Sequence, residues 1–375
     1  MTFTFRFIIR LFLTMIISLI LTPMVKLLAF KIGAVDKPGA RRINTKTMPT
    51  AGGLSIFISF SIALLWEFND TLPLDKVWPM ILGALIIVVT GLIDDIFELT
   101  PLQKTLGITL AALEAYFIAG IEINTFSLPF FGRFELGWLS LPVTLLWILA
   151  ITNAVNLIDG LDGLAAGISI IGLTTIGLIS YFFLPHTGVF LAIIIFSLVA
   201  SIIGFFPYNF HPATIYLGDT GALFLGYMIA ILSLQGLKNA TFITILTPMF
   251  ILGVPITDTV YAMIRRKFNK QPISSADKMH LHHRLLSLGF THRGAVLTIY
   301  ALALVFSFIA LLMNYASTWA TVLLIVFTAV GLELFIELIG LVGENRQPLM
   351  CALKFLGNRR FRQDVLTKHH EDKEE

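Results

Sequence analysis

The chain has few charged residues: Asp, Glu, Lys and Arg make up 13% of its 375 residues. Soluble domains average roughly 25% charged residues, so this chain cannot cover a soluble fold with a polar surface. Hydrophobic residues make up 57% of the chain, and its mean hydropathy is +0.87. These values predict a protein whose surface is mostly in contact with lipid.

Cysteine is nearly absent as well. Cys351 is the single cysteine, which excludes an intrachain disulfide and gives no information about the redox compartment. The segment 1–25 is hydrophobic enough to resemble a secretory signal peptide, but no small-residue cleavage site follows it. We therefore expect this segment to remain in the protein as a first membrane helix. The sequence shows no internal repeat and no separate soluble domain.

Long hydrophobic segments occur throughout the chain. A bilayer core of roughly 30 Å requires about 20 apolar residues per helix, and about eleven segments approach this length. We expect membrane-spanning helices near residues 6–29, 51–68, 77–93, 103–120, 138–156, 163–184, 188–207, 220–236, 241–263, 295–314 and 319–341. The predicted fold is all-α and polytopic, with a single integral membrane domain over residues 1–345. Residues 346–375 form a tail that is first basic and then acidic.

Lysine and arginine predict the orientation, because basic residues concentrate in cytoplasmic loops. With the N-terminus outside, most of the 26 basic residues fall on the inner side. The inner segments are then 30–50, 94–102, 157–162, 208–219, 264–294 and the tail after 341. The outer side holds Arg6, Arg10, Lys76, Arg133 and Lys238. The sequence thus predicts an outside N-terminus and a cytoplasmic C-terminus.

Acidic residues cluster on the same predicted side of the membrane. Those at or just beyond the ends of apolar segments are Asp94, Asp95, Asp159, Asp162 and Asp219. Carboxylates gathered at one membrane surface need a cation, and a divalent metal that carries a phosphorylated substrate fits best. The adjacent pair in GLIDDIFELTP would otherwise repel and lose hydration. A solvated loop after a helix is the alternative for this pair.

The segment NAVNLIDGLDGLAAG is more specific. Asn153 and Asn156 share a helix face, and Asp159 repeats the spacing if the helix continues. Gly160 then breaks the turn and lets the backbone approach a ligand. The segment thus carries two amides and two acids, of which Asp162 is the second acid. Burying these groups in an apolar setting is costly unless they bind a ligand. The alternative is a glycine-rich turn with capping aspartates.

Two other segments carry single acids. In YLGDTGALFLG, Asp219 stands at the start of a span, where it is either a ligand or an ordinary N-cap. Tyr216 is either an interface aromatic residue or a platform for a nucleobase. In GVPITDTVYAMIRR, Asp258 lies within a span, which indicates a function unless the residue makes a polar contact between helices.

The segment ADKMHLHHRLLSLG places His280, His282, His283 and Arg284 in the last large inner loop. H-x-H-H without a fourth nearby ligand is a poor zinc signature. Contact with a diphosphate fits better, because the arginine fork matches phosphate oxygens. A solvated loop with incidental histidines is the alternative. The first inner loop is also basic, and Lys46 in it precedes the turn PTAGG.

Together these motifs resemble the polyprenyl-phosphate N-acetylhexosamine-1-phosphate transferases, which are membrane enzymes that start bacterial cell-wall polymers and lipid-linked glycans. The resemblance covers about residues 30–295. It includes DD at 94–95, NxxNxxDGxDGL at 153–164, GDTG at 218–221 and HLHH at 280–283. The order of the motifs and their predicted side of the membrane also agree with the family.

Within this family, the segment 272–293 looks most like the enzymes that make the linkage unit of wall teichoic acid. Their relatives start enterobacterial common antigen and the O-antigen of lipopolysaccharide. The resemblance implies transfer of N-acetylglucosamine 1-phosphate from UDP-GlcNAc to undecaprenyl phosphate, with release of UMP. The run HLHHR argues against the muramoyl-pentapeptide branch, although UDP-MurNAc-pentapeptide remains the alternative donor. Glu98 stands where some members have a third Asp, so the role of that position is open.

The resemblance also implies roles for the acidic residues. Asp219 matches the principal Mg²⁺ ligand and Asn156 a second or indirect ligand, with Mn²⁺ as a substitute ion. Asp94 and Asp95 match catalytic positions near the lipid phosphate and the metal. Asp159 matches a catalytic acid that some distant members lack.

The resemblance places the remaining residues around the substrates. Asp162 matches a position that contacts uracil, and we also include it among the predicted catalytic residues. Tyr216 is expected to stack on the uracil. His282 and His283 match catalytic residues at the diphosphate. The other predicted substrate contacts are Lys46, Asn153, His280 and Arg284.

The acceptor phosphate needs little activation, because the second pKa of a phosphate monoester is about 6. We therefore predict direct attack by the lipid phosphate, with a two-step route through an aspartate nucleophile as the alternative. An ion-coupled transporter is the alternative from another class, since intramembrane acids also mark ion pathways. We expect a bacterial cytoplasmic (inner) membrane, an active site facing the cytoplasm and no nucleic-acid partner, with homodimerisation left open.

Overall fold

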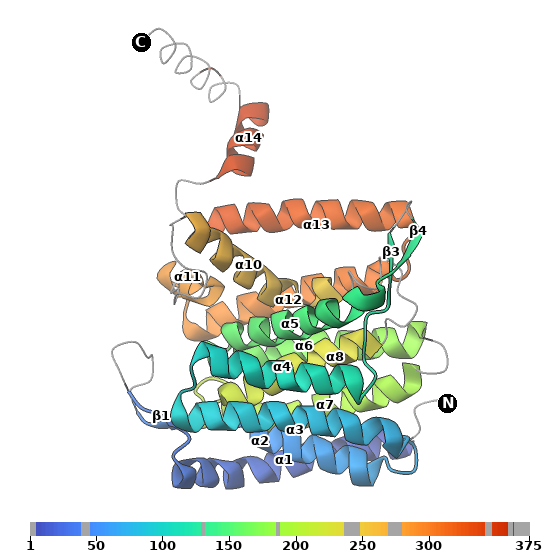
Figure 1. Cartoon of the computed structure of the whole chain (residues 1–375). Coiled ribbons are helices and arrows are strands. Elements are labelled where there is room, and N and C mark those ends of the chain that lie inside the picture. Colours follow the sequence, from blue (N-terminus) through green and yellow to red (C-terminus); the bar gives the residue numbers. More distant parts are fainter. Residues whose placement is uncertain are drawn as a thin grey trace.

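The computed structural model describes residues 5–38, 46–128, 132–184, 188–235, 248–268, 280–341, 347–358 and 363. Most of its long helices lie side by side with nearly aligned axes (Figure 1). The helices are α1 (Phe5–Ile32), α2 (Gly53–Ile62), the π-helical turn η1 (Ala63–Glu67), α3 (Leu74–Phe97), α4 (Pro101–Phe117), α5 (Ser140–Ile158), α6 (Leu164–Phe183), α7 (Gly188–Asn209), α8 (Gly218–Gln235), α10 (Gly253–Phe268), α11 (Leu281–Ser287), α12 (His292–Met313), α13 (Thr318–Ile339) and α14 (Pro348–Gly357).

Two short antiparallel hairpins connect helices, which the all-α prediction did not include. β1 (Val35–Asp36) pairs with β2 (Met48–Pro49), and β3 (Thr125–Leu128) pairs with β4 (Gly132–Glu135). A 3-10 turn, η2 (Gly137–Leu139), follows the second hairpin. Backbone groups in these connections have no helix to satisfy them, so they pair with each other. The first hairpin leads directly into the turn PTAGG.

Seven described helices are long and apolar enough to cross a membrane: Phe5–Ile32, Leu74–Phe97, Gly137–Ile158, Leu164–Phe183, Gly188–Asn209, His292–Met313 and Thr318–Ile339. Helices α2, α4, α8 and α10 also lie in predicted spans but are shorter or less apolar. The predicted span 241–263 is described only from residue 248 onward. The all-α, polytopic prediction is confirmed, whereas the count of eleven and the orientation stay predictions.

Helix α8 lies at the centre of the bundle. Every residue from Thr220 to Leu234 is buried, and the helix packs against α2, α3, α5, α6 and α7. A helix that is apolar on all sides is stable only when other helices surround it. Because α8 begins with Gly218 and Asp219, this central position fixes an acidic residue at one end of the core.

The outer helices present apolar side chains to their surroundings. Helix α13 exposes Trp319, Leu323, Phe327 and Leu338, and it forms the edge of the bundle next to α14 (Figure 1). A large exposed apolar surface marks a site of contact with a partner or a membrane. In a chain with this composition, we attribute it to contact with lipid acyl chains.

Candidate active site

Three glycine-containing segments meet at the ends of α3 and α8. A Cβ added to Gly53 would lie 2.1 Å from the Gly221 Cα, and one added to Gly91 would lie 2.5 Å from the Thr220 Cα. The Gly53 N–H also donates to the Leu217 carbonyl at 3.0 Å. Only glycine permits such close backbone contact. The approach brings PTAGG, GLIDD and GDTG, which are distant in the sequence, into one site.

Asp95 caps the N-terminus of α8. Its Oδ1 accepts the Asp219 N–H at 3.0 Å, and its Oδ2 accepts the Thr220 N–H at 3.0 Å and the Thr220 hydroxyl at 2.5 Å. The first N–H groups of a helix lack intrahelical partners, and a negative charge there is favoured by the helix dipole. Asp95 therefore fixes where α8 begins, and its catalytic role stays a prediction.

Lys104 links two of the predicted acids. Its Nζ pairs with Asp94 Oδ2 and lies 2.9 Å from Asp219 Oδ1. Asn156 Nδ2 donates to the same Asp219 oxygen at 2.5 Å, and Asp94 Oδ1 accepts the Leu99 N–H at 2.7 Å. Asp94, Asp219 and Asn156 thus lie together as the motifs predict, whereas Lys104 was not predicted as a site residue.

The turn between α3 and α4 explains the position of Lys104. Helix α3 ends at Phe97, and its C-cap residue Glu98 adopts a left-handed conformation (φ 52°). Helix α4 then begins with a capping box in which Thr100 and Gln103 bond reciprocally, and with Pro101 at its first position. The short turn leaves Lys104 in the first turn of α4, facing back toward Asp94. The capping-box pattern in TPLQK was the available sequence signal for this arrangement.

Asp159 lies near other carboxylates. It follows the last residue of α5, and its N–H donates to the Asn156 carbonyl at 3.2 Å. Burial raises the pKa of Asp159 well above its usual range, and three nearby negative charges raise it further: Asp219, Asp95 and Asp162. Carboxylates that share a site need a cation to ionise together. Carboxylate and amide oxygens are the donors that Mg²⁺ prefers, so these residues fit the predicted metal.

Asp162 holds the loop that precedes the GDTG segment. Its Oδ2 accepts the Ala213 N–H at 3.0 Å and lies 2.8 Å from His211 Nδ1. Its own N–H donates to His292 Nε2 at 3.1 Å. Burial raises the pKa of the Tyr216 hydroxyl, and the charge of Asp162 raises it further. The two residues predicted to contact the nucleobase therefore lie close enough to interact, but neither histidine was predicted.

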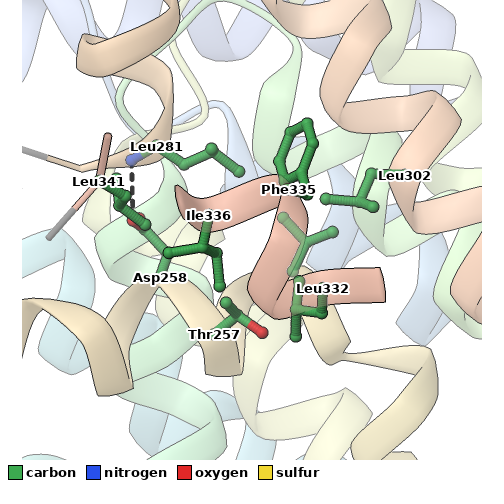
Figure 2. Close-up of a pocket in the computed structure, with 9 residues that line it drawn as sticks. Thr257, Asp258, Leu281, Leu302, Leu332, Phe335, Ile336 and Leu341 are labelled. Carbon is green, nitrogen blue, oxygen red and sulfur yellow. Dashed lines mark hydrogen bonds between the residues drawn. The ribbon is translucent and has the colours of Figure 1, made fainter. Parts of the chain in front are cut away.

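Asp258 holds the histidine segment. Its Oδ2 lies 3.0 Å from His280 Nδ1, and its Oδ1 accepts the Leu281 N–H at 2.8 Å. These bonds secure the start of α11. Asp258 and Leu281 line a cavity whose other walls are mainly apolar (Figure 2). A Cβ added to Gly160 would lie 2.3 Å from His282 Nε2, so this histidine packs directly on the glycine between the two aspartates of the DGLD turn.

His282 is a neutral imidazole at pH 7. Burial, together with the neighbouring His283, lowers the pKa of His282 to about 3, and the two ring centroids are 4.2 Å apart. Its Nδ1 is buried without a hydrogen-bond partner among the described residues. A neutral imidazole donates one hydrogen bond and accepts another. In this neutral form, the ring would contact a diphosphate oxygen by donating a hydrogen bond.

Three other residues predicted to contact a substrate have partners or positions outside the group of acidic residues. Arg284 Nε donates to the Ile339 carbonyl at 2.6 Å, so the guanidinium anchors the C-terminus of α13. Asn153 Nδ2 donates to the Leu149 carbonyl of its own helix at 2.8 Å. Lys46 is exposed just ahead of β2. The substrate contacts proposed for these three residues stay predictions, and the geometry of Arg284 shows a structural role that its motif does not reveal.

Apolar helices around a site of carboxylates, amides, a lysine and histidines define an integral membrane enzyme. Residues 77–237 match the family model described as glycosyl transferase family 4. A probable undecaprenyl-phosphate N-acetylglucosaminyl 1-phosphate transferase of Bacillus subtilis strain 168 is 44% identical over 358 residues, covering 94% of this chain and 98% of that protein.

More distant relatives are also named as polyprenyl-phosphate N-acetylglucosamine-phosphate transferases. A decaprenyl-phosphate N-acetylglucosaminephosphotransferase of Mycolicibacterium smegmatis is 34% identical, covering 76% of each chain. An undecaprenyl-phosphate alpha-N-acetylglucosaminyl 1-phosphate transferase of Escherichia coli K12 is 28% identical, covering 77% of this chain and 78% of that protein. The chain belongs to glycosyl transferase family 4, which confirms the family resemblance drawn from its motifs.

Proposed function

We propose that this protein transfers N-acetylglucosamine 1-phosphate from UDP-GlcNAc to undecaprenyl phosphate, yielding undecaprenyl-diphospho-GlcNAc and UMP. The observation that carries the proposal is the 44% identity, over 94% of the chain, to a probable transferase of this specificity. The meeting of the PTAGG, DD, NxxNxxDGxDGL and GDTG segments at one site supports it. The product would be the first lipid-linked intermediate of a surface glycopolymer such as wall teichoic acid.

The chemistry requires two phosphorylated substrates to approach each other. Two like charges at 4 Å repel by about 4 kcal/mol at an effective dielectric of 20. Lys104, placed between Asp94 and Asp219, offers a positive charge where the phosphates would meet. Asp219 and Asn156 would hold Mg²⁺, which when bound neutralises charge on phosphate oxygens.

The protein would then act mainly by positioning. The lipid phosphate is mostly dianionic at pH 7, since its second pKa is about 6, and it can attack the diphosphate without a general base. His282 is neutral and lies against Gly160, so it would bind a diphosphate oxygen by a hydrogen bond. Tyr216 beside Asp162 would hold the uracil ring.

The site is proposed to face the cytoplasm of a bacterial cell. The basic residues concentrate in the segments on that side when the N-terminus is outside. UDP-sugars are made in the cytoplasm, and the predicted donor would reach the site from there. Labelling of single cysteines introduced at exposed positions 37 and 75 of a Cys351→Ser protein in intact cells tests this orientation, because the two are expected on opposite sides.

The function is tested by UMP release from purified protein. We expect UMP release to require UDP-GlcNAc, undecaprenyl phosphate and Mg²⁺ together, and EDTA to abolish it. Product formation with UDP-MurNAc-pentapeptide instead of UDP-GlcNAc would reassign the donor. Ion-coupled solute flux in proteoliposomes without any UMP release would replace the transferase by a transporter.

The Asp258→Asn variant tests whether the histidine segment must be fixed for activity. The asparagine oxygen can still accept the Leu281 N–H, but its amide can bond His280 only by donating to Nδ1, which requires the other ring tautomer. Loss of the His280 bond or a forced change of tautomer costs about 1–3 kcal/mol. We expect kcat/KM for UDP-GlcNAc to fall by about 10-fold to 100-fold, since each 1.36 kcal/mol is tenfold. Initial rates of UMP release measure the effect.

Asp70→Asn is the matched control for this variant. Asp70 is exposed and pairs with Arg10 in the N-terminal half of α1, where an exposed ion pair contributes little to stability. We expect its kcat/KM to equal that of the unmodified protein. An Asp258→Asn protein with unchanged kcat/KM would show that the segment finds its active position without this carboxylate.

A further inference from the structure

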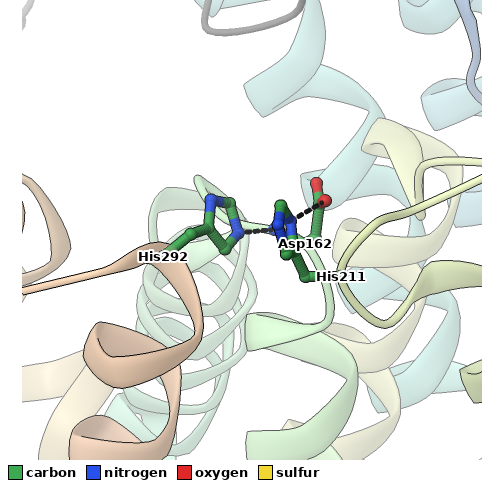
Figure 3. Close-up of side chains that lie close together, drawn as sticks. All are labelled: Asp162, His211 and His292. Atoms are coloured by element: carbon green, nitrogen blue, oxygen red, sulfur yellow. Dashed lines mark hydrogen bonds and ion pairs between the residues drawn. The ribbon is translucent and has the colours of Figure 1, made fainter.

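Asp162, His211 and His292 form a cluster apart from Asp219 and Asn156, the proposed Mg²⁺ ligands. They come from the turn after α5, the loop after α7 and the first residue of α12, and Figure 3 shows the three side chains pointing toward one another. One ligand atom from each lies within 4.8 Å of the other two. The two imidazole rings stack with centroids 4.2 Å apart.

We propose that Asp162, His211 and His292 form a second metal site, which binds a zinc-class divalent ion. Two imidazoles and one carboxylate are a donor set that suits Zn²⁺, whereas Mg²⁺ prefers oxygen ligands alone. Three protein ligands would leave a fourth position for water. The site would therefore differ from the proposed Mg²⁺ site in both its residues and its preferred ion.

The distances are compatible with this assignment. Donor atoms about 2.0–2.2 Å from a tetrahedral zinc ion lie roughly 3.3 Å from each other. The His211 Nδ1 to Asp162 Oδ2 distance is 2.8 Å, so this pair would open slightly as the ion replaces the hydrogen bond. The other pairs lie within 4.8 Å. His292 Nε2 accepts the Asp162 N–H at 3.1 Å, so the His292 ring would turn away from its stack on His211 to direct this nitrogen at the ion.

The surrounding contacts already hold the three segments together. Ala213 N–H donates to Asp162 Oδ2 at 3.0 Å, and a carboxylate oriented in this way is a better metal ligand. Arg293 Nη2 donates to the His211 carbonyl at 3.1 Å, and the Tyr300 hydroxyl donates to the Gly163 carbonyl at 2.5 Å. These hydrogen bonds thus hold the three segments in place without a bound ion.

Exposure also favours entry of an ion. The side chains of His211 and Asp162 are 35% and 16% exposed, so an ion can reach them from solvent. By contrast, the side chains of Asp258 and His280 in the other histidine cluster are 3% and 8% exposed. This burial shields both groups from solvent, which makes that cluster the weaker candidate.

The test is direct binding of Zn²⁺ to the full-length protein, purified without a polyhistidine tag and stripped with EDTA. We expect one Zn²⁺ per chain by competition with a chromophoric chelator. His211→Ala and His292→Ala should each raise the dissociation constant by about 100-fold or more, beyond the 10–100-fold effect of losing an outer-shell partner. Co²⁺ in place of Zn²⁺ should give the visible absorption of a tetrahedral site. None of these readouts requires turnover, so the proposal stands or fails separately from the proposed function.

His283→Ala and His369→Ala are the matched controls, and both should bind Zn²⁺ like the unmodified protein. A monodisperse elution profile and an unchanged melting temperature without metal establish that each variant is folded. If one variant fails to fold, the other histidine variant decides the question. Absence of stoichiometric binding, or binding that is lost in His283→Ala but kept in His211→Ala and His292→Ala, would overturn the proposal.

Discussion

Replacing Asp219 with asparagine is expected to lower kcat for UMP release by about 10³-fold, the effect of removing one preorganised electrostatic group from an active site. The substitution keeps the shape of the side chain but removes its negative charge. That charge pairs with Lys104 at 2.9 Å and would provide the main carboxylate ligand for Mg²⁺. We expect the Mg²⁺ concentration needed for half-maximal activity to rise in the same assay.

The fold should survive this substitution. Asp95 caps α8 through the backbone N–H of Asp219 and not through its side chain, so the variant keeps the helix start. We therefore expect normal expression, membrane insertion and melting temperature, which separates lost chemistry from lost structure. Asn156 can still donate its hydrogen bond to the amide oxygen of the new residue.

Asp75→Asn provides the matched control. Asp75 is an exposed residue in the first turn of α3, about 30 Å along the helix from Asp94 at a rise of 1.5 Å per residue. The same chemical change there should leave kcat unchanged. The metal assignment is wrong if purified Asp219→Asn protein turns over at the normal rate.

Gly91→Ala is expected to damage the site through packing alone. The added methyl group would lie 2.5 Å from the Thr220 Cα and 2.6 Å from the Asp219 carbonyl oxygen. Both neighbours are backbone atoms of α8, which cannot rotate away as a flexible side chain can. Overpacking of this kind costs about 1–3 kcal/mol, and a displacement of about 1 Å in an active site lowers turnover by roughly 10²-fold.

The measurements are thermal unfolding in detergent and UMP release, compared with Gly331→Ala. Gly331 lies in α13 with no atom within 4 Å of an added Cβ, and alanine is the better helix former by roughly 1 kcal/mol. That variant should be at least as stable as the unmodified protein and fully active. Equal stability and activity for Gly91→Ala would contradict the close contact between α3 and α8.

Much of the architecture was predictable from residue type and spacing. The apolar segments at 6–29, 77–93 and 188–207 coincide with α1, α3 and α7, because a bilayer requires helices of a certain length. The regular spacing of Asn153, Asn156 and Asp159 predicted one helix face, and α5 contains the two asparagines and ends just before Asp159. The two short hairpins were not predicted, since their strands are only two and four residues long.

The sequence allowed the acidic residues of the site to be predicted, but not the residues that pair with them. Lys104 and Asp219 are 115 positions apart, and Asp162 and His292 are 130 positions apart. No local pattern marks such partners, because only the packing of helices brings them together. Arg284 likewise has a partner that its motif does not mark, since its Nε bonds the Ile339 carbonyl at the end of α13. The phosphate contact that the motif suggested stays a prediction.

Residue composition is enough to establish that the chain forms apolar helices, because backbone polar groups in lipid must be satisfied within the helix. The motifs are enough to establish which chemical groups are available and the family. Helix packing, which no local pattern reveals, sets which acid caps a helix, which one pairs with Lys104 and which one holds two histidines. These pairs depend on how each helix is rotated about its axis and how far it is shifted along it. Close backbone contacts of Gly53 and Gly91 with α8 constrain both the rotation and the shift.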